Sequence, residues 1–256
     1  MDAQALWPTF AEHLRRLYPR GVAPDERIGS GWCAVATGER HPDLNLGVLT
    51  SAATRSDAAE LVSYFAERGV PAAVSVASAL NADVSEELRD AGYERAPQRE
   101  ALMWCSQRPV ASDGFRVDPV TGADETVAAI AIVAEGHGVE GVDRVIEQAP
   151  YPGRPVTAWL AWDGDRPLSV VWLTAGPRIG VWAMMTPPAH RRRGAGRAAL
   201  SSALARTWSP ETEGAFHWSS PMGRALYESL GFEALDECSI WVLGGTEEML
   251  AILGNT

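Results

Sequence analysis

The chain has 256 residues, of which 46% are hydrophobic and 21% are charged. This composition is typical of a globular protein with a buried core and excludes a disordered chain, and the length allows one large domain or two of ordinary size. Lys and Arg number 22 against 33 Asp and Glu, a formal net charge of -11. That balance argues against nucleic acid as a partner and mildly favours a cationic ligand, although acidic surfaces also keep proteins soluble.

The cysteines and the apolar segments indicate the compartment. Three widely spaced cysteines without a CxxC pair predict neither a disulfide framework nor a metal site, and they fit the reducing cytoplasm. Residues 1–20 lack the apolar run of a signal peptide and predict an amphipathic helix, whose apolar face carries Leu6, Phe10, Leu14 and Leu17. No apolar stretch reaches the ~18 residues of a membrane span, so we expect no membrane partner.

The first half of the chain predicts a mixture of strands and helices. Runs rich in β-branched and apolar residues predict strands, at 32–37, 44–50, 72–77 and 99–105. Helical periodicity predicts two helices, at 56–69 and 83–92. A polar segment with Pro and Gly, 106–114, follows and is interpreted as a linker. We therefore expect two domains, 1–108 and 115–256.

The second half begins with a strand at 115–121 and a capped helix at 121–135, followed by a loop and a short helix. Three strands within 157–186 are separated by DGDR and AGPR turns, which predicts an antiparallel meander. A helix (191–208), a strand (214–220), a helix ending at Gly231 (221–231) and a last strand (239–245) complete the pattern. The fold class is α/β (α+β), with a mixed, mostly antiparallel central sheet flanked by helices.

The order of elements in the first half resembles the later part of the second half, which predicts a tandem repeat. Thr50 aligned with Thr186 gives an offset of 186 minus 50, or 136 residues. Gly92 aligned with Gly231 gives 231 minus 92, or 139. The two offsets agree within a short loop.

The chemistry is concentrated where the strand ending near Thr186 leads into the next helix. Gly194 and Gly196 leave the main chain uncovered there, so that N–H groups and the positive end of the helix can face an anion. Four arginines within seven residues add positive charge, namely Arg191, Arg192, Arg193 and Arg197. The pattern favours a diphosphate site; the alternative is a solvated basic helix start whose glycines serve only the turn.

The run from Arg191 to Gly196, RRRGAG, resembles the R/Q-x-x-G-x-G/A signature of the GNAT acetyltransferases, and the run from Leu226 to Phe232 is similar to their LYxxxGF segment. The resemblance covers roughly residues 115–243. It implies acetyl-CoA as co-substrate, with its pantetheine arm along the main chain of Met184, Met185 and Thr186. Its pyrophosphate would be bound by the loop Arg191, Arg192, Arg193, Gly194, Ala195, Gly196 and Arg197.

The resemblance implies an N-acetyltransferase that moves an acetyl group to a primary amine by direct attack in a ternary complex. The acceptor would be a small molecule or a peptide, and the protein a monomer or a homodimer. Two alternatives stay open: a non-catalytic acyl-CoA-binding or sensing protein, and a loop that binds another phosphorylated ligand. Acidic residues in 135–155, the region that walls the acceptor site in the family, favour a cationic amine.

By the same resemblance Tyr227 donates a proton to the departing thiolate, and Ser220 stands where the family often has an Asn that holds the CoA arm. The alternative for Tyr227 is an amphipathic helix residue at the sheet interface, but Leu226 and Leu230, four apart, already supply the buried stripe, and Tyr227 is turned ~100° from it. Strand 181–186 has no Asp or Glu to act as general base. The candidates are imidazoles and carboxylates that could relay a proton: His217, Glu135, His137 and Glu140.

The first copy would have lost this chemistry. On the Thr50 register, Ala58 and Glu60 replace Gly194 and Gly196, and on the Gly92 register Leu88 replaces Tyr227. We therefore expect a degenerate N-terminal domain with no cofactor of its own. Trp172, Trp182 and Trp218 fall on strands near the expected cleft, where burial in the core is favoured over cation binding.

Overall fold

The computed structural model describes residues 1–17, 25–80, 82–137 and 156–244. The chain forms two compact units: unit 1 contains Met1–Leu102, Ser219–Arg224 and Ala234–Thr256, and unit 2 contains Met103–Trp218 and Ala225–Glu233. Unit 1 thus combines most of the first half of the sequence with two segments of the second half. The expected linker, 106–114, lies near the beginning of unit 2.

Unit 1 is built on strands in the order β1-β2-β3-β4-β11-β5. Their bounds are β1 (Asp25–Ile28), β2 (Trp32–Ala36), β3 (Asn45–Leu49), β4 (Ala72–Val76), β11 (Glu233–Leu243) and β5 (Glu94–Cys105). Pairing is antiparallel from β1 to β3 and between β4 and β11, but parallel between β3 and β4. A parallel pair needs a long crossover, and helix α2 (Arg55–Arg68) supplies it.

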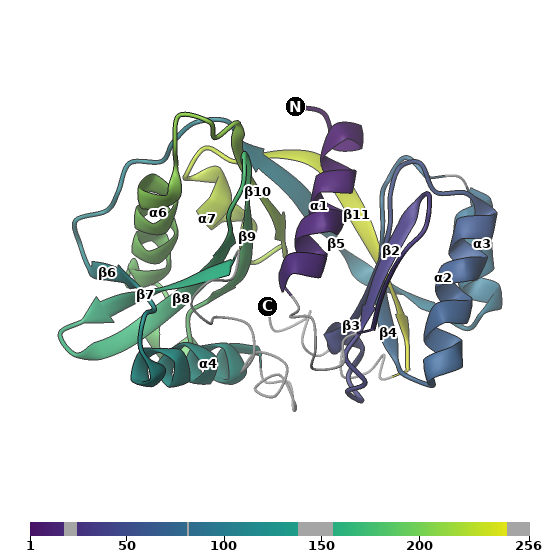
Figure 1. Ribbon diagram of the computed structural model, residues 1–256, viewed down its shortest axis with the longest axis horizontal. Helices are drawn as coiled ribbons and strands as arrows, with labels where there is room; N and C mark the ends of the chain where they lie inside the picture. Colours follow the sequence, from purple (N-terminus) through teal and green to yellow (C-terminus); the bar gives the residue numbers. More distant parts are fainter. Residues whose placement is uncertain (18–24, 81, 138–155, 245–256) are drawn as a thin grey trace. The chain divides into compact units, whose positions relative to one another are not determined.

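Helices cover both faces of this sheet, as the complete burial of β2 requires. On one face α2 and α3 (Ala82–Asp90) lie side by side (Figure 1). They share a core with alternate residues of β2, to which β2 contributes Trp32, Ala34 and Ala36 and α2 contributes Leu61, Tyr64 and Phe65. Helix α1 (Ala3–Leu17) lies on the other side of β2 in Figure 1 and buries the expected side chains Leu6, Phe10 and Leu14. The side chain of Leu17 lies outside the described residues.

Unit 2 has the strand order β6-β7-β8-β9-β10, followed by the end of β5. Its strands are β6 (Arg116–Pro119), β7 (Val156–Asp163), β8 (Arg166–Thr174), β9 (Arg178–Met185) and β10 (Gly214–Ser219). β6 to β9 pair antiparallel, which confirms the expected meander, and β10 joins β9 in parallel after helix α6 (Ala195–Thr207). Helices α6 and α4 (Ala123–His137) cover opposite faces (Figure 1).

The remaining elements are short. They are helix α7 (Arg224–Glu228) and the 3-10 turns η1 (Pro42–Leu44) and η2 (Pro188–His190). Strand β1 was not expected from the sequence, and the helix expected at 221–231 is reduced to α7. The short helix expected after 135 falls outside the described residues. No helix in the described part of the chain is long and apolar enough to cross a membrane.

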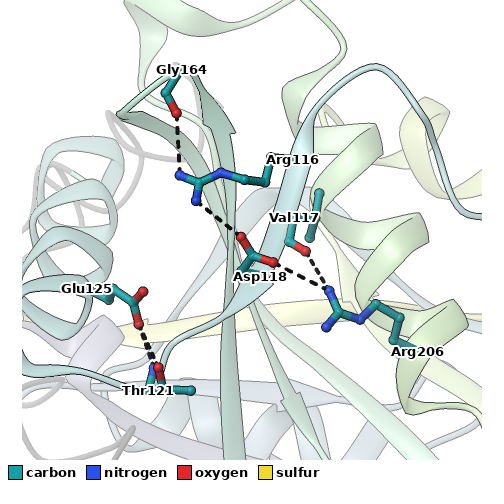
Figure 2. Close-up of polar contacts among 7 residues, drawn as sticks. All are labelled: Arg116, Val117, Asp118, Thr121, Glu125, Gly164 and Arg206. Atoms are coloured by element: carbon teal, nitrogen blue, oxygen red, sulfur yellow. Dashed lines mark hydrogen bonds and ion pairs between the residues drawn. The ribbon is translucent and has the colours of Figure 1, made fainter.

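Two arginines fix the edge strand β6 in unit 2 (Figure 2). Arg206 of α6 donates to the carbonyl of Val117 at 2.6 Å and lies 3.8 Å from the carboxylate of Asp118. Arg116 lies 3.6 Å from the other oxygen of Asp118 and donates to the Gly164 carbonyl at 3.4 Å. The register of β6 is therefore tied to α6 and to the β7–β8 turn.

The two halves of the sequence contain the same succession of elements. Unit 1 has β1-β2-β3-α2-β4-α3-β5, and the C-terminal half has β7-β8-β9-α6-β10-α7-β11. In each, a left-handed glycine follows the second helix, Gly92 with φ 87° and Gly231 with φ 86°. The residue after each glycine donates its N–H to the corresponding carbonyl, Tyr93 to Leu88 and Phe232 to Tyr227. The local geometry agrees with the 139-residue offset.

The final strand of each succession is divided between the units. Most of β11 belongs to unit 1, where it lies between β4 and β5. The last three residues of β5, Met103 to Cys105, belong to unit 2, where β5 neighbours β10. Gly214 allows that neighbour to approach closely, because a Cβ there would lie 2.6 Å from the Cys105 carbonyl oxygen.

Candidate active site

The pairing of β9 and β10 ends before β9 does. The register joins Arg178–Val181 to Gly214–His217, whereas β9 continues to Met185. β9 is also irregular at this point, because Ala183 has a φ of 41° and the register with β8 shifts between Val170 and Trp172. Such a bulge places an extra residue on one strand and leaves it unpaired.

The bulge distinguishes the three residues expected to hold the pantetheine arm. The carbonyl of Met185 accepts a hydrogen bond from Ser169 at 2.8 Å, and the carbonyl of Thr186 accepts one from Arg191 at 3.0 Å. Met184 lies within the bulge, between the paired positions Trp182 and Met185. Its main chain is therefore the best placed of the three to pair with an extended ligand. Ser169 carried no recognisable signal in the sequence.

The loop after β9 turns sharply into α6. Arg192 has a φ of 64° and Gly194 a φ of 89°, both in the left-handed region. Gly194 is the residue before the helix and supplies no side-chain cap. The first N–H groups of α6 are therefore left for another acceptor, and the helix dipole favours an anion at the same point. The expected glycine loop has the geometry of an anion site.

Gly196 fits α6 tightly against the end of β9. A Cβ at this position would lie 3.0 Å from the Cε of Met184 and 3.0 Å from the Oγ1 of Thr186. Ala195 is buried beneath the turn. The two glycines thus serve different needs: Gly194 permits a positive φ, and Gly196 permits close packing.

Three of the four loop arginines are held by other groups of unit 2. Arg191 binds the Thr186 carbonyl, Arg193 the Asp163 carboxylate at 2.7 Å, and Arg197 both the hydroxyl and the carbonyl of Ser229. Arg192 is exposed, and it makes no ion pair or hydrogen bond with the described residues. Its guanidinium is the one most open to an added anion.

Tyr227 of α7 is buried, with 3% of its surface exposed, whereas Leu226 and Leu230 are only partly buried. The expected Leu stripe was wrong, because α7 spans only five residues and buries its tyrosine instead. The Tyr227 ring stacks on His217 with centroids 3.9 Å apart and meets Phe232 edge-on at 5.6 Å. Burial raises the pKa of Tyr227 above its usual value, so the phenol keeps its proton.

His217 of β10 lies at the last paired position of the β9–β10 ladder. Its Nδ1 is 2.9 Å from the carbonyl oxygen of Val181. Because a carbonyl oxygen only accepts, Nδ1 carries the proton, and Nε2 keeps a lone pair in the neutral ring. Burial lowers the pKa of His217 to about 4, although the Val181 hydrogen bond acts in the opposite direction.

The other expected site residues are exposed, bonded to other groups or undescribed. Glu135 is exposed near the end of α4, next to Gly136, which packs against the side chain of Met185. Ser220 belongs to unit 1, and its hydroxyl accepts the Gly223 N–H at 3.3 Å. The His137 side chain and Glu140 lie outside the described residues, as does most of the acidic segment 135–155. Trp172 and Trp182 are buried, as favoured, and Trp218 is partly buried.

A scan against protein-family models finds no match, and no curated protein matches the sequence. Solved structures do match the fold. A GCN5-related N-acetyltransferase from Kribbella flavida aligns with a TM-score of 0.69 at 17% identity, over 95% of this chain and 96% of its own. A GCN5-related N-acetyltransferase from Sphaerobacter thermophilus aligns with a TM-score of 0.60 at 11% identity, over 83% and 76%. This chain has the GNAT fold.

A tandem GNAT protein from the clavulanic acid biosynthesis pathway also aligns, with a TM-score of 0.53 at 13% identity, over 94% of both chains. At these identities the likeness concerns the fold. The expected GNAT fold class, a mixed and mostly antiparallel sheet flanked by helices, is confirmed.

Within this GNAT fold, the start of α2 differs from the start of α6. Nine residues separate β9 from α6 (186–194) and five separate β3 from α2 (50–54). The residue before α2 is Thr54, so Thr54 and Ser56 correspond to Gly194 and Gly196. The alignment with Ala58 and Glu60 was wrong, because the unit 1 loop is four residues shorter.

A carboxylate of unit 1 occupies the start of α2. Thr54 and Asp57 form a capping box, in which Asp57 accepts from the Thr54 N–H at 2.8 Å and the Thr54 hydroxyl at 2.7 Å. The other oxygen of Asp57 accepts from Ser30 and Gly31. Burial alone would raise the pKa of Asp57, but the hydrogen bonds from Ser30, Thr54 and Gly31 lower it overall. The TxxD pattern was readable in the sequence.

Proposed function

We propose that this protein is an acetyl-CoA-dependent N-acetyltransferase that moves an acetyl group to a primary amine of a small molecule or a peptide, by direct attack in a ternary complex. Unit 2 carries the reaction, and unit 1 binds no cofactor of its own. The GNAT fold supports acetyl transfer in general terms. The acceptor and the use of acetyl-CoA belong to the proposal.

The observation that carries the proposal is the contrast between the two helix starts. At α6 the N–H groups are uncapped, the loop is left-handed at Arg192 and Gly194, and Arg192 is exposed. At α2 the equivalent place holds the Asp57 carboxylate and the Thr54 cap. An anion such as a pyrophosphate is attracted to the first site and repelled from the second.

The residues of unit 2 fit an extended thioester with a phosphate end. The α6 start and Arg192 would bind the pyrophosphate, and Met184 in the β9 bulge would pair with the pantetheine arm. Acetyl-CoA supplies the activated acetyl group. Tyr227, protonated because of its raised pKa, would donate its proton to the leaving thiolate.

The test is the thermal stability of the wild type and of Arg192→Gly, with and without acetyl-CoA. A ligand that binds only the native state stabilises it by about 2.7 kcal/mol at a hundred times its Kd. Gly suits the positive φ at position 192, so Arg192→Gly should fold at least as stably as the wild type while its ligand-induced shift falls. The matched control, Arg95→Ala, removes one exposed positive charge from unit 1 and should shift like the wild type.

If acetyl-CoA at millimolar concentration shifts neither protein, the proposal is wrong. Isothermal calorimetry then counts the sites, for which we expect one acetyl-CoA per chain; two would contradict the assignment of unit 1. Release of free thiol with primary amines separates an acetyltransferase from a protein that only binds acyl-CoA, because only the enzyme turns over.

A further inference from the structure

We infer that His217 is the proton acceptor of this reaction, and that its Nε2 takes the proton that the attacking amine loses. The inference rests on the function proposed above and deepens it. It assigns the general base, for which the sequence left His217 among four candidates.

The first step is the tautomer. The Val181 carbonyl, 2.9 Å from Nδ1, holds the proton on that nitrogen. Nε2 then presents a lone pair, and it has no hydrogen-bond partner among the residues that the structure describes. A base must offer such a lone pair before the substrate arrives.

The second step is the position of the ring. His217 lies where the β9–β10 pairing ends, and its ring stacks on Tyr227 with centroids 3.9 Å apart and planes 28° from parallel. Tyr227 is the proposed proton donor to the thiolate. Stacking therefore places a proton acceptor beside a proton donor, as transfer between a nucleophile and a leaving group on one carbonyl carbon requires.

The third step compares the other candidates. β9 carries no carboxylate from Arg178 to Met185. Glu135 is exposed on α4. His217 is the one of the described candidates that touches the proposed proton donor.

The reaction balances with these two groups. The nitrogen of the neutral amine forms a bond to the acetyl carbon, and the bond from that carbon to the CoA sulfur breaks. The amine loses one proton to His217 Nε2, and the thiolate gains the hydroxyl proton of Tyr227. The imidazolium then returns a proton to the tyrosinate through water, which restores both side chains.

Nitrogen-15 NMR of the histidine rings at neutral pH tests the tautomer without any substrate. His217, identified by the resonance missing from His217→Phe, should have a protonated Nδ1 and a bare Nε2. His41 is an internal reference with the opposite tautomer. Its Nδ1 accepts the Asp43 N–H at 3.2 Å, so the proton of its neutral ring must lie on Nε2. A protonated Nε2 on His217 would overturn the inference.

Two variants then separate the role of His217 as a base from its two structural roles, which are stacking on Tyr227 and the hydrogen bond to the Val181 carbonyl. His217→Phe keeps an aromatic ring against Tyr227, and His217→Asn keeps an N–H donor for the Val181 carbonyl. Thiol release from acetyl-CoA is measured with spermidine, an aminoglycoside, lysine and a tetrapeptide. Both variants should lose at least about a hundredfold in rate while keeping the thermal shift with acetyl-CoA.

A variant that retains the wild-type rate would show that stacking or the Val181 bond suffices, and the inference would fail while the proposed function stands. If the wild type is stabilised by acetyl-CoA but releases no thiol with any amine, the proposed function fails first, and the role of His217 falls with it. The two failures are thus distinguishable.

Discussion

Arg192 combines a left-handed backbone with a charged, exposed side chain. Positive φ is uncommon outside glycine and is retained where the surrounding structure or a function requires it. The neighbouring arginines have partners in unit 2, so they help to shape the loop as well as to charge it. The sequence predicted the four charges but could not rank them, because the partners of Arg193 and Arg197 lie about 30 residues away in the sequence, at Asp163 and Ser229.

Tyr227→Phe tests the proposed role of Tyr227 as general acid, because it removes only the hydroxyl group. Phe keeps the ring that contacts His217 and Phe232, so stability and acetyl-CoA binding should change little. Loss of the hydroxyl should lower the rate of thiol release by about 10²–10⁴-fold, the usual contribution of general acid catalysis. Stopped assays with a thiol reagent measure it. An unchanged rate would mean that the thiolate leaves without help from this phenol.

His217 shows what sequence reasoning could reach. Its residue type made it a candidate base, but its tautomer depends on the strand register that brings the Val181 carbonyl to Nδ1. The Tyr227 prediction followed from a motif, whereas its burial did not, because the helical stripe assumed a longer helix than α7.

At the scale of elements, α2 and α6 hold the same place in the two successions of strands and helices, but their first turns differ in chemistry. Helix α6 begins with an uncapped glycine, which gives up only a few tenths of a kcal/mol of capping stability relative to a good cap. Helix α2 keeps that stability through Thr54 and Asp57. The offset from Thr50 paired Gly194 with Ala58 and not with Thr54, because loop length cannot be read from an offset between distant landmarks.

Asp57→Ala should destabilise unit 1 by about 1–2 kcal/mol, since it removes the capping box and its bonds to Ser30 and Gly31. The folded pKa of Asp57 is lowered. Its stabilisation is therefore complete above the unfolded pKa of about 3.9 and is lost as the pH falls further, through the folded pKa. Urea unfolding at pH 7 and pH 3 measures this: the difference between wild type and variant should be smaller at pH 3 than at pH 7. A constant difference would contradict the assignment.

At the scale of the molecule, the alternation of strands and helices was predictable from periodicity, and the solved GNAT structures bear it out. The neighbours of the last strand of each half, β5 and β11, were not predictable in this way. Periodicity identifies β5 and β11 as strands but says nothing of their neighbours, and β11 pairs with β4 from the other half of the sequence.

The division of β11 and β5 predicts how the halves behave when separated. Residues 1–108 alone lack β11, which leaves the paired edge of β4 uncovered and prone to aggregation. We expect this fragment to be insoluble or to lack a cooperative unfolding transition, and co-expression with 115–256 to restore a soluble complex. Circular dichroism melts of the two preparations measure it. Cooperative melting of 1–108 alone at the full-chain temperature would contradict the prediction.

The pairing of β11 with β4 also has a consequence for the evolution of the gene. A deletion of the first half would leave the final strand of the second half without its β4 neighbour. On the function proposed above, selection for the activity of the second half would therefore also preserve the first half, as the folding partner of β11.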